Sequence, residues 1–236
     1  MVAFIGRTTR RSAVIASAAV LLGACDGRAL FSRAGPVGPS LRSMHTYGLL
    51  AGSTVICGGP LGAITADVGL WPGSVVSGFP TCTIYGTSNT ANAAAQAAQG
   101  DLTTAYQALT DMACGTTLSA DLGGMTLAPG VYCSTSTQGL TGTVTLDGQG
   151  RTNATFVIQV VGALTVSGAV DLIGGAEAKN VWWQVGSATI GTSSIMEGNI
   201  LALQSITMND YSTLIGRALA RDGSVTMGSG NTISPQ

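Results

Sequence analysis

The sequence predicts a mostly β protein, built as a solenoid of stacked coils with one long helix alongside. The first observation is a threonine that recurs in the last third of the chain at intervals of about 20 residues, close to the length of one solenoid coil. The second is that apolar residues flank each of these threonines. The third is a single helical pattern, in a chain whose 34 glycines and 9% charged residues suit short strands and tight turns.

Four short segments align on the recurring threonine: ALTVSG, SATIGT, SITMND and GSVTMG. Because neighbouring side chains of a strand point to opposite faces, the threonines should point outward while their apolar neighbours point inward. The predicted outward column is Thr165, Thr189, Thr207 and Thr226, and Thr141, one such interval before Thr165, extends it. The columns on either side are Ala163, Ser187, Ser205 and Ser224, and Ser167, Gly191, Asn209 and Gly228.

Residues 1–29 have the pattern of a secretory signal peptide, with three arginines before an apolar run from Ser12 to Leu22 and small residues after it. An internal first helix is the alternative. Leu22-Gly23-Ala24-Cys25 resembles a bacterial lipobox, which would attach a lipid to Cys25. Thr9-Arg10-Arg11 loosely resembles a twin-arginine signal. We therefore expect the protein outside the cell, either free or anchored through Cys25.

Four cysteines remain when Cys25 is removed or modified: Cys57, Cys82, Cys114 and Cys133. An even number in an exported chain favours disulfides, with three possible pairings. We favour Cys57–Cys82 and Cys114–Cys133, and buried free thiols are the alternative. The cysteine spacing does not match a zinc site, and His45 is the one histidine that could contribute.

Residues 30–46 are rich in Gly, Pro, Arg and Ser and indicate a linker, followed by a solenoid domain over 47–236. From Tyr47 the runs are β-like and resemble one further coil, separated in sequence from the others. Residues 88–113 carry apolar side chains at helical spacing, with glutamines and threonines opposite. Such a helix would be about 37 Å long at about 1.5 Å per residue. About six coils, stacked at about 4.8 Å, would match that length.

The first strand of each later coil is apolar almost throughout, which implies burial on both faces. These strands are expected in residues 154–160, 180–185, 199–203 and 217–220. We expect the helix to cover this side, near Phe156, Trp182 and Trp183.

Catalytic and metal-binding patterns are missing from the sequence. The acids Asp67, Asp121, Asp147, Asp171 and Glu197 are scattered, and none is expected to stack with another on an exposed strand. No Ser-His-Asp set, phosphate-binding glycine loop or metal-ligand cluster can be built. Without the leader the net charge is about −4, so a basic footprint for nucleic acid is absent. We expect no catalytic residues, no metal, no cofactor, no small-molecule substrate and no nucleic-acid partner.

The threonine face suits an ordered, uncharged, repeating ligand such as ice or crystalline polysaccharide. A stacked sheet with side-chain ladders can be flat, and β-branched threonine is stiff at χ1. Each hydroxyl contributes only about 0.5–1.5 kcal/mol, but many acting together on one plate bind strongly. The alternative is that threonine is simply a favourable strand residue on a solvent-facing surface.

Several long stretches occur in the same order as in a known family: LLAGSTV (49–55), ITADVGLWPGSVVSGFP (64–80), DLTTAYQAL (101–109), DLGGMTLAPGVY (121–132), FVIQV (156–160), GGAEAKNVWWQVG (174–186), EGNILALQSITM (197–208) and GRALARDGSVTM (216–227). The chain resembles the secreted microbial ice-binding proteins, also called DUF3494 or type 1 ice-binding (antifreeze) proteins. This resemblance implies a right-handed solenoid of triangular cross-section with a helix alongside. It also implies that the N-terminal coil lies at one end, and that the later coils start at the far end and run back toward it.

The resemblance further implies a non-enzymatic, monomeric protein of cold adaptation that binds ice through the face formed by the second strands. Such proteins depress freezing without an equal effect on melting, and they inhibit recrystallisation. Thr54 and Ile56 would be the contribution of the first coil to that face. The four cysteines, and Ile56 in place of a threonine, depart from many family members. A polysaccharide-binding or adhesive protein on the same scaffold is the alternative function, and a solenoid enzyme is a third.

Overall fold

The computed structural model describes residues 35–79, 81–119 and 121–236. The chain divides into two units, Met1–Arg33 and Ala34–Gln236, and the second is compact and contains all of the structure described below. The expected signal peptide and Cys25 lie outside the described residues. Within the described part of the chain, no helix is long and apolar enough to cross a membrane.

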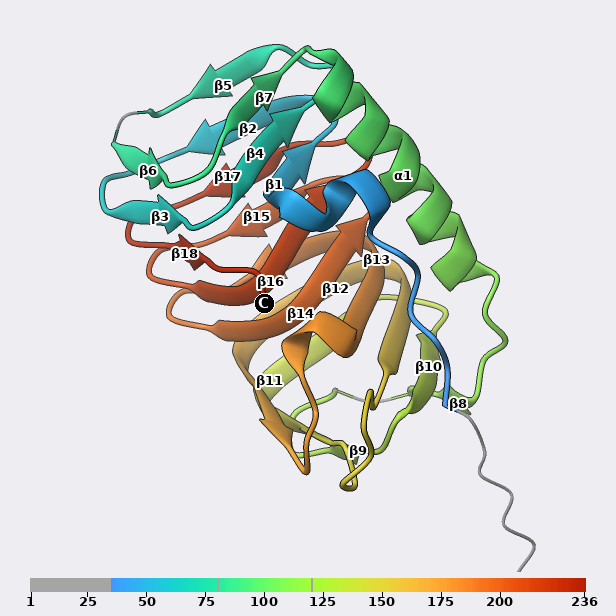
Figure 1. Ribbon diagram of the computed structural model, residues 1–236. Helices are drawn as coiled ribbons and strands as arrows, with labels where there is room; N and C mark the ends of the chain where they lie inside the picture. The colour runs from blue at the N-terminus through green and yellow to red at the C-terminus, as the bar shows by residue number, and fades with distance from the viewer. Residues whose placement is uncertain (1–34, 80, 120) are drawn as a thin grey trace, which may run out of the picture. The chain divides into compact units, whose positions relative to one another are not determined.

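The second unit is a solenoid with three faces of parallel strands (Figure 1). Face A contains five whole strands: β1 (Tyr47–Ala51), β4 (Asp67–Leu70), β7 (Ser88–Thr90), β8 (Thr116–Thr117) and β10 (Gly130–Ser134). It also contains the first parts of β12 (Phe156–Ile173) and β13 (Val181–Ile190) and the last parts of β14 (Ile195–Ala202) and β16 (Thr213–Ala220). Face B contains β2 (Thr54–Cys57), β5 (Val75–Ser77), β15 (Ile206–Met208), β17 (Val225–Met227), the start of β11 (Gln138–Asp147), the middle of β12 and the end of β13. Face C contains β3 (Gly62–Ile64), β6 (Cys82–Ile84), β9 (Thr126–Leu127), β18 (Thr232–Ile233) and the remaining parts of β11, β12, β14 and β16.

The coils do not stack in sequence order. The last coil pairs with the first, β17 with β2 and β16 with β1, so that red and blue strands lie side by side in Figure 1. The coil of β11 lies beyond β12, toward the opposite end. The later coils therefore run back toward the N-terminal ones, as the family resemblance implied.

The N-terminal part contributes two coils, where the sequence predicted one. β4, β5 and β6 pair with β1, β2 and β3 and form a second coil. Its strands are only three or four residues long and are interrupted at Trp71-Pro72-Gly73 and Gly78, which obscured the repeat. Among the described residues, seven segments stack on face B: β5, β2, β17, β15, β13, β12 and β11.

Alternation of side chains separates two apolar clusters. On face A, Trp183, Phe156 and their like-facing neighbours point into the solenoid interior. Trp182 and Leu201 point the other way, against the helix. Burial of these strands on both sides is confirmed, but Phe156 and Trp183 do not lie in the helix contact. They alternate with the residues that do, because successive strand side chains point to opposite faces.

The helix that covers face A is α1 (Ala93–Thr110), shorter at both ends than the predicted 88–113. Residues 88–90 pair with β4 as a strand, and Asn92 begins the helix by accepting a hydrogen bond from the Ala95 N–H. At the other end Gln159 of the solenoid donates its amide N–H groups to the carbonyl oxygens of Leu109 and Met112. These long-range contacts set the helix length.

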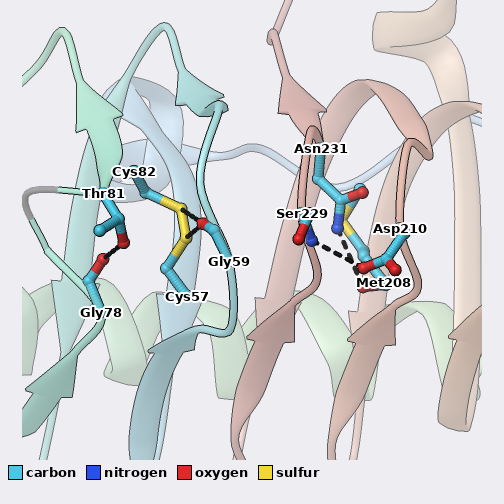
Figure 2. Close-up of a disulfide and its surroundings, with 9 residues drawn as sticks. All are labelled: Cys57, Gly59, Gly78, Thr81, Cys82, Met208, Asp210, Ser229 and Asn231. Carbon is cyan, nitrogen blue, oxygen red and sulfur yellow. Dashed lines mark hydrogen bonds between the residues drawn. A yellow bond between two sulfur atoms is a disulfide. The ribbon is translucent and has the colours of Figure 1, made fainter.

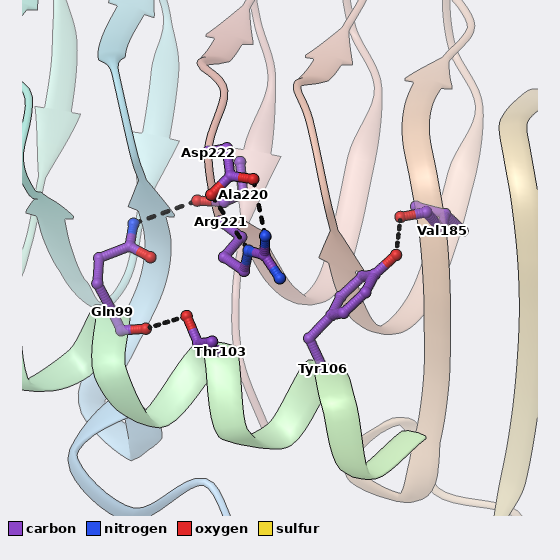
Figure 3. Close-up of polar contacts among 7 residues, drawn as sticks. All are labelled: Gln99, Thr103, Tyr106, Val185, Ala220, Arg221 and Asp222. Carbon is purple, nitrogen blue, oxygen red and sulfur yellow. Dashed lines mark hydrogen bonds and ion pairs between the residues drawn. The ribbon is translucent and has the colours of Figure 1, made fainter. Parts of the chain in front are cut away.

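Polar contacts also fasten α1 to the coils (Figure 3). The Tyr106 hydroxyl donates to the carbonyl oxygen of Val185 at 3.2 Å, and Gln99 Nε2 donates to that of Ala220 at 3.2 Å. Leu102 and Leu109 are fully buried beneath the helix. Face A is consequently occupied by the protein's own helix.

Part of the predicted linker is ordered structure. Residues 42–46 form the short helix η1 (Arg42–Thr46), and Met44 is fully buried against α1. The backbone N–H and the hydroxyl of Ser43 donate to Asp101 on α1, and the hydroxyl bond holds the pKa of that carboxyl below its usual range. Arg217 Nη2 donates to the His45 carbonyl oxygen at 3.0 Å. A second short helix, η2 (Ala178–Asn180), precedes β13.

Both expected disulfide pairings are confirmed. Cys57 at the end of β2 is bonded to Cys82 at the start of β6, with the Cα atoms 6.2 Å apart. Cys114, after α1, is bonded to Cys133 in β10, with the Cα atoms 5.9 Å apart. Each bridge fixes a coil near one end of the solenoid.

Candidate functional site

The four aligned threonines stand opposite one another on face B. Thr165 pairs with Thr189, Thr189 with Thr207, and Thr207 with Thr226. The same column, here called the centre column, continues through Ile56 to Ser77 in one direction and to Gly139 in the other. The sequence alignment of these coils therefore gave the register of the four threonines correctly.

The inward neighbours explain why the threonines point outward. Ile190, Met208 and Met227, each following a centre-column threonine, are almost fully buried in the solenoid interior. A shift of one residue would place these side chains in water and the hydroxyls in the core, so the register is strongly fixed. Thr165 is exposed, and the other three threonines are half-buried between their neighbours.

Small polar residues form a column on each side of the threonines. The upstream column contains Ala163, Ser187, Ser205, Ser224, Thr54 and Val75. In it the Ser224 hydroxyl donates to the Ser205 hydroxyl at 3.2 Å, so neighbouring coils are linked at the surface. The downstream column contains Thr141, Ser167, Gly191, Asn209, Gly228 and Gly58.

Thr141 lies on face B, but not in the centre column where the sequence placed it. Its partner is Ser167, and Gly139 stands opposite Thr165. The interval between Thr141 and Thr165 did not fix the register, because loops of variable length join the coils. The pairing is set instead by burial of Leu140 against Val166 in the core.

Two carboxylates border this face, although the columns predicted from the sequence contain no charged residue. Asp121 accepts hydrogen bonds from the N–H groups of Gly123 at 2.7 Å and Thr141 at 2.8 Å, and from the Thr141 hydroxyl at 3.1 Å. The bond from the Thr141 N–H is the main reason that the pKa of Asp121 lies below its usual range. A Cβ atom on Gly139 would meet the Asp121 carboxylate, which thus occupies the place of a side chain at the end of the centre column.

The Asp210 carboxylate likewise fills the space beside a glycine, at the downstream edge of face B. Its Oδ1 accepts the Ser229 N–H at 2.7 Å, and a Cβ atom on Gly228 would meet that oxygen (Figure 2). The only sequence signal for either carboxylate is a glycine interrupting a column of small side chains. Such a signal does not reveal which distant residue fills the space.

Face C carries two acids side by side, contrary to the expectation that no acids stack. Ala169 of β12 pairs with Ile195 of β14, so Asp171 and Glu197, two residues further on, share a row. Burial, and then the charge of Asp171, raise the pKa of Glu197. Among the described residues, no group of three His, Cys, Asp or Glu side chains could hold a metal ion. The sole histidine, His45, lies in η1, with Nδ1 2.7 Å from the carbonyl oxygen of Arg42.

We predict that Glu197→Gln stabilises the protein at neutral pH, by up to about 0.5 kcal/mol. A carboxyl whose pKa is raised by folding binds its proton more tightly in the folded state, so stability falls as pH rises through the folded pKa. The difference between variant and parent should vanish below the unfolded pKa of about 4.3. Urea unfolding at a series of pH values measures it. A variant that is less stable than the parent at neutral pH would show that the Glu197 carboxylate is a favourable contact.

Known proteins resemble this chain over most of its length. A family model described as ice-binding-like matches residues 49–234. An ice-binding protein of Nostoc sp. (strain HG1) is 43% identical over 191 residues, which cover 79% of this chain and 71% of that protein. An ice-binding protein of Flavobacterium frigoris (strain PS1) is 39% identical over 118 residues, covering 49% of this chain and 42% of that protein.

Solved structures show the same architecture. The crystal structure of an ice-binding protein from an Antarctic biological consortium has a TM-score of 0.83 at 42% identity, covering 85% of this chain and 92% of that one. The structure of the ice-binding protein of the Antarctic ascomycete Antarctomyces psychrotrophicus has a TM-score of 0.80 at 35% identity, covering 84% of this chain and 98% of that one.

Proposed function

Because the chain belongs to the ice-binding-like family, we propose that it binds ice through face B and thereby slows crystal growth. As a member of this family the protein is not an enzyme. The observation that carries the assignment of the face is the pairing of Thr165, Thr189, Thr207 and Thr226 in one column on parallel, in-register strands. Columns with serine, asparagine and glycine extend the threonine surface on both sides.

The chemistry of the face suits a solid made of water. Threonine hydroxyls can donate to and accept from water molecules, while their methyl groups lie between them as apolar surface. Each threonine is stiff at χ1 and is held by a buried neighbour, so little conformational freedom is lost on adsorption. One hydroxyl contributes only about 0.5–1.5 kcal/mol, but simultaneous contacts from one rigid plate add up to tight adsorption.

The other two faces are less suitable. Face A is covered by α1, whose Leu102 and Leu109 are buried against the coils. Face C carries the adjacent carboxylates of Asp171 and Glu197, charged groups that an ice lattice would have to desolvate. Face B is the remaining broad surface, and its charges lie at the margins.

Binding of a crystalline polysaccharide through the same face is less well supported. Among the described residues, the three columns of face B carry no aromatic side chain, whereas protein sites for sugars usually offer an aromatic ring for stacking. The tryptophans lie elsewhere: Trp183 is in the core, Trp182 packs on the side of face A that the helix covers, and Trp71 is at a turn.

We further propose that the protein is exported and acts outside the cell as a monomer. Two disulfides suit an oxidising compartment, and residues 1–29 have the pattern of a signal peptide. Attachment of a lipid at Cys25 would instead keep the protein on the cell surface. Mass spectrometry of the mature protein from its host would distinguish a free N-terminus from a lipid-modified Cys25.

The function is tested by cooling a solution of the purified protein with a single ice crystal and observing growth and shape. We expect faceted crystals, a gap between the freezing and melting temperatures, and inhibition of recrystallisation in a frozen polycrystalline sample. Crystals that grow as they do in buffer would contradict the proposal.

A further inference from the structure

A second column of unusual residues runs along the corner between faces B and C. Ser193, Tyr211, Gly230 and Leu61 occupy equivalent positions in four successive coils, and all have positive φ, at 56°, 58°, 66° and 66°. Backbone hydrogen bonds fix this alignment: the Tyr211 N–H donates to the Ser229 carbonyl oxygen, and the Gly230 N–H donates to that of Pro60.

Tyrosine and leucine are poor choices for these positions as far as folding is concerned. The left-handed conformation crowds any side chain that has a Cβ atom, and glycine or asparagine adopts it more easily. The side chains gain little burial in return, since Tyr211 is 61% exposed and Leu61 is 77% exposed. Two large apolar side chains are therefore held in water, in a strained conformation, at the same place in the fold. Such strain is often found at functional sites.

The exposed side chains lie next to face B. A Cβ atom on Gly230 would meet the ring of Tyr211, so this ring lies across the neighbouring coil toward the coil of Leu61. Tyr211 follows Asn209 of the downstream column by two residues, and Leu61 follows Gly58 of that column by three, so both side chains lie just beyond this edge of face B. We name Tyr211 and Leu61 the apolar corner.

We propose that the apolar corner is a second contact region for ice, which extends the adsorbing surface beyond the hydroxyl columns and around the edge of face B. The proposal rests on the proposed function of face B. Removing exposed apolar surface from water lowers the free energy, and groups of such residues mark interaction sites. The tyrosine adds a hydroxyl at the tip of a rigid ring. Ice is the occupant because the corner adjoins the downstream column of face B, so a crystal seated on the threonines and reaching that edge would also meet it.

The test compares the parent with Tyr211→Gly, Leu61→Gly and the double variant. Glycine relieves the left-handed strain, so the melting temperature should stay level or rise by about 2–4 °C. We expect the thermal hysteresis of the double variant to fall by about half or more, since the contacts act together. A loss of activity without loss of stability is the opposite of what a structural role would produce. Tyr211→Asn with Leu61→Asn provides a second pair, because asparagine also tolerates this conformation.

Tyr85→Ser is the matched control, since Tyr85 is 71% exposed and follows β6 on face C, away from the corner. It should keep the hysteresis of the parent. Parent-like hysteresis in both double variants would overturn the role of the corner while leaving face B intact. A parent dimer that the double variants convert to monomer, measured by analytical ultracentrifugation, would overturn it in favour of self-association. Absence of hysteresis from the parent would overturn the proposed function itself, and with it this inference.

Discussion

Replacing Thr207 with tyrosine should reduce thermal hysteresis to less than about a fifth of the parent value, because adsorption depends on many contacts forming at once. Thr207 lies in the middle of the centre column, between Thr189 and Thr226. A phenol ring there would project beyond the neighbouring hydroxyls and hold the whole face away from the crystal. Thr189→Tyr should have the same effect. Hysteresis measured with a nanolitre osmometer gives the comparison.

The fold should survive this substitution, because the side chain points away from the core. The flanking Ile206 and Met208 stay buried, and the strand pairing does not involve the threonine side chain. The circular dichroism spectrum and the melting temperature should therefore match those of the parent. This separates loss of the binding surface from loss of structure.

Thr213→Tyr is the control for both substitutions. Thr213 is also half-buried on a parallel strand, with Ile195 and Thr232 as its partners, but it lies on face C. We expect near-parent hysteresis from this variant. Equal losses at positions 189, 207 and 213 would show that the assignment of the binding face is wrong.

The centre column could be predicted from sequence because two constraints repeat together. Each outward threonine is flanked by inward apolar residues, and a stacked parallel sheet places equivalent residues of successive coils opposite each other. Burial of Ile190, Met208 and Met227 fixes the register of the threonines wherever the coils are similar in length. Apolar runs on face A similarly indicated that a second layer covers it.

Features determined by contacts between distant residues could not be predicted in this way. Thr141 was placed in the wrong column because its coil is joined by a loop of different length, and the pairing of Leu140 with Val166 decides the register. Asp121 fills the space above Gly139 from a turn before β9, in an earlier part of the chain. Likewise, the pairing of residues 88–90 with β4 shortened the predicted helix. Local periodicity carries no information about any of these contacts.

The corner near Cys57 shows how the interior of the solenoid changes at its end (Figure 2). In the middle coils a buried polar pair supports the turn: Asn231 Oδ1 accepts the N–H of Ser212 at 2.9 Å, and Nδ2 donates to the Met208 carbonyl oxygen at 2.9 Å. In the next coil Gly62 takes the place of Asn231, and a Cβ atom there would meet the sulfur of Cys82. The Cys57–Cys82 disulfide thus lies, in this coil, where the side chain of Asn231 lies in the coil before it.

Removing this disulfide with Cys57→Ser and Cys82→Ser should lower the free energy of unfolding by about 3 kcal/mol, from the chain entropy released by opening its loop. The two cysteines are 25 residues apart in sequence. The loss should be concentrated in β5 and β6, which pair with β2 and β3 and form the end coil. Urea unfolding gives the energy, and hydrogen exchange of the folded protein gives the location.

The bridge at the other end provides the matched comparison. Cys114→Ser with Cys133→Ser opens a loop of similar sequence separation, 19 residues, and should lower stability by a similar amount, about 3 kcal/mol. Here the faster exchange should appear in β8 and β10 instead, while β5 and β6 stay protected. Identical exchange patterns for the two variants would contradict the idea that each disulfide stabilises its own end. Hysteresis should fall more with the first bridge, because Val75 and Ser77 of the end coil belong to face B, whereas β8 and β10 belong to face A.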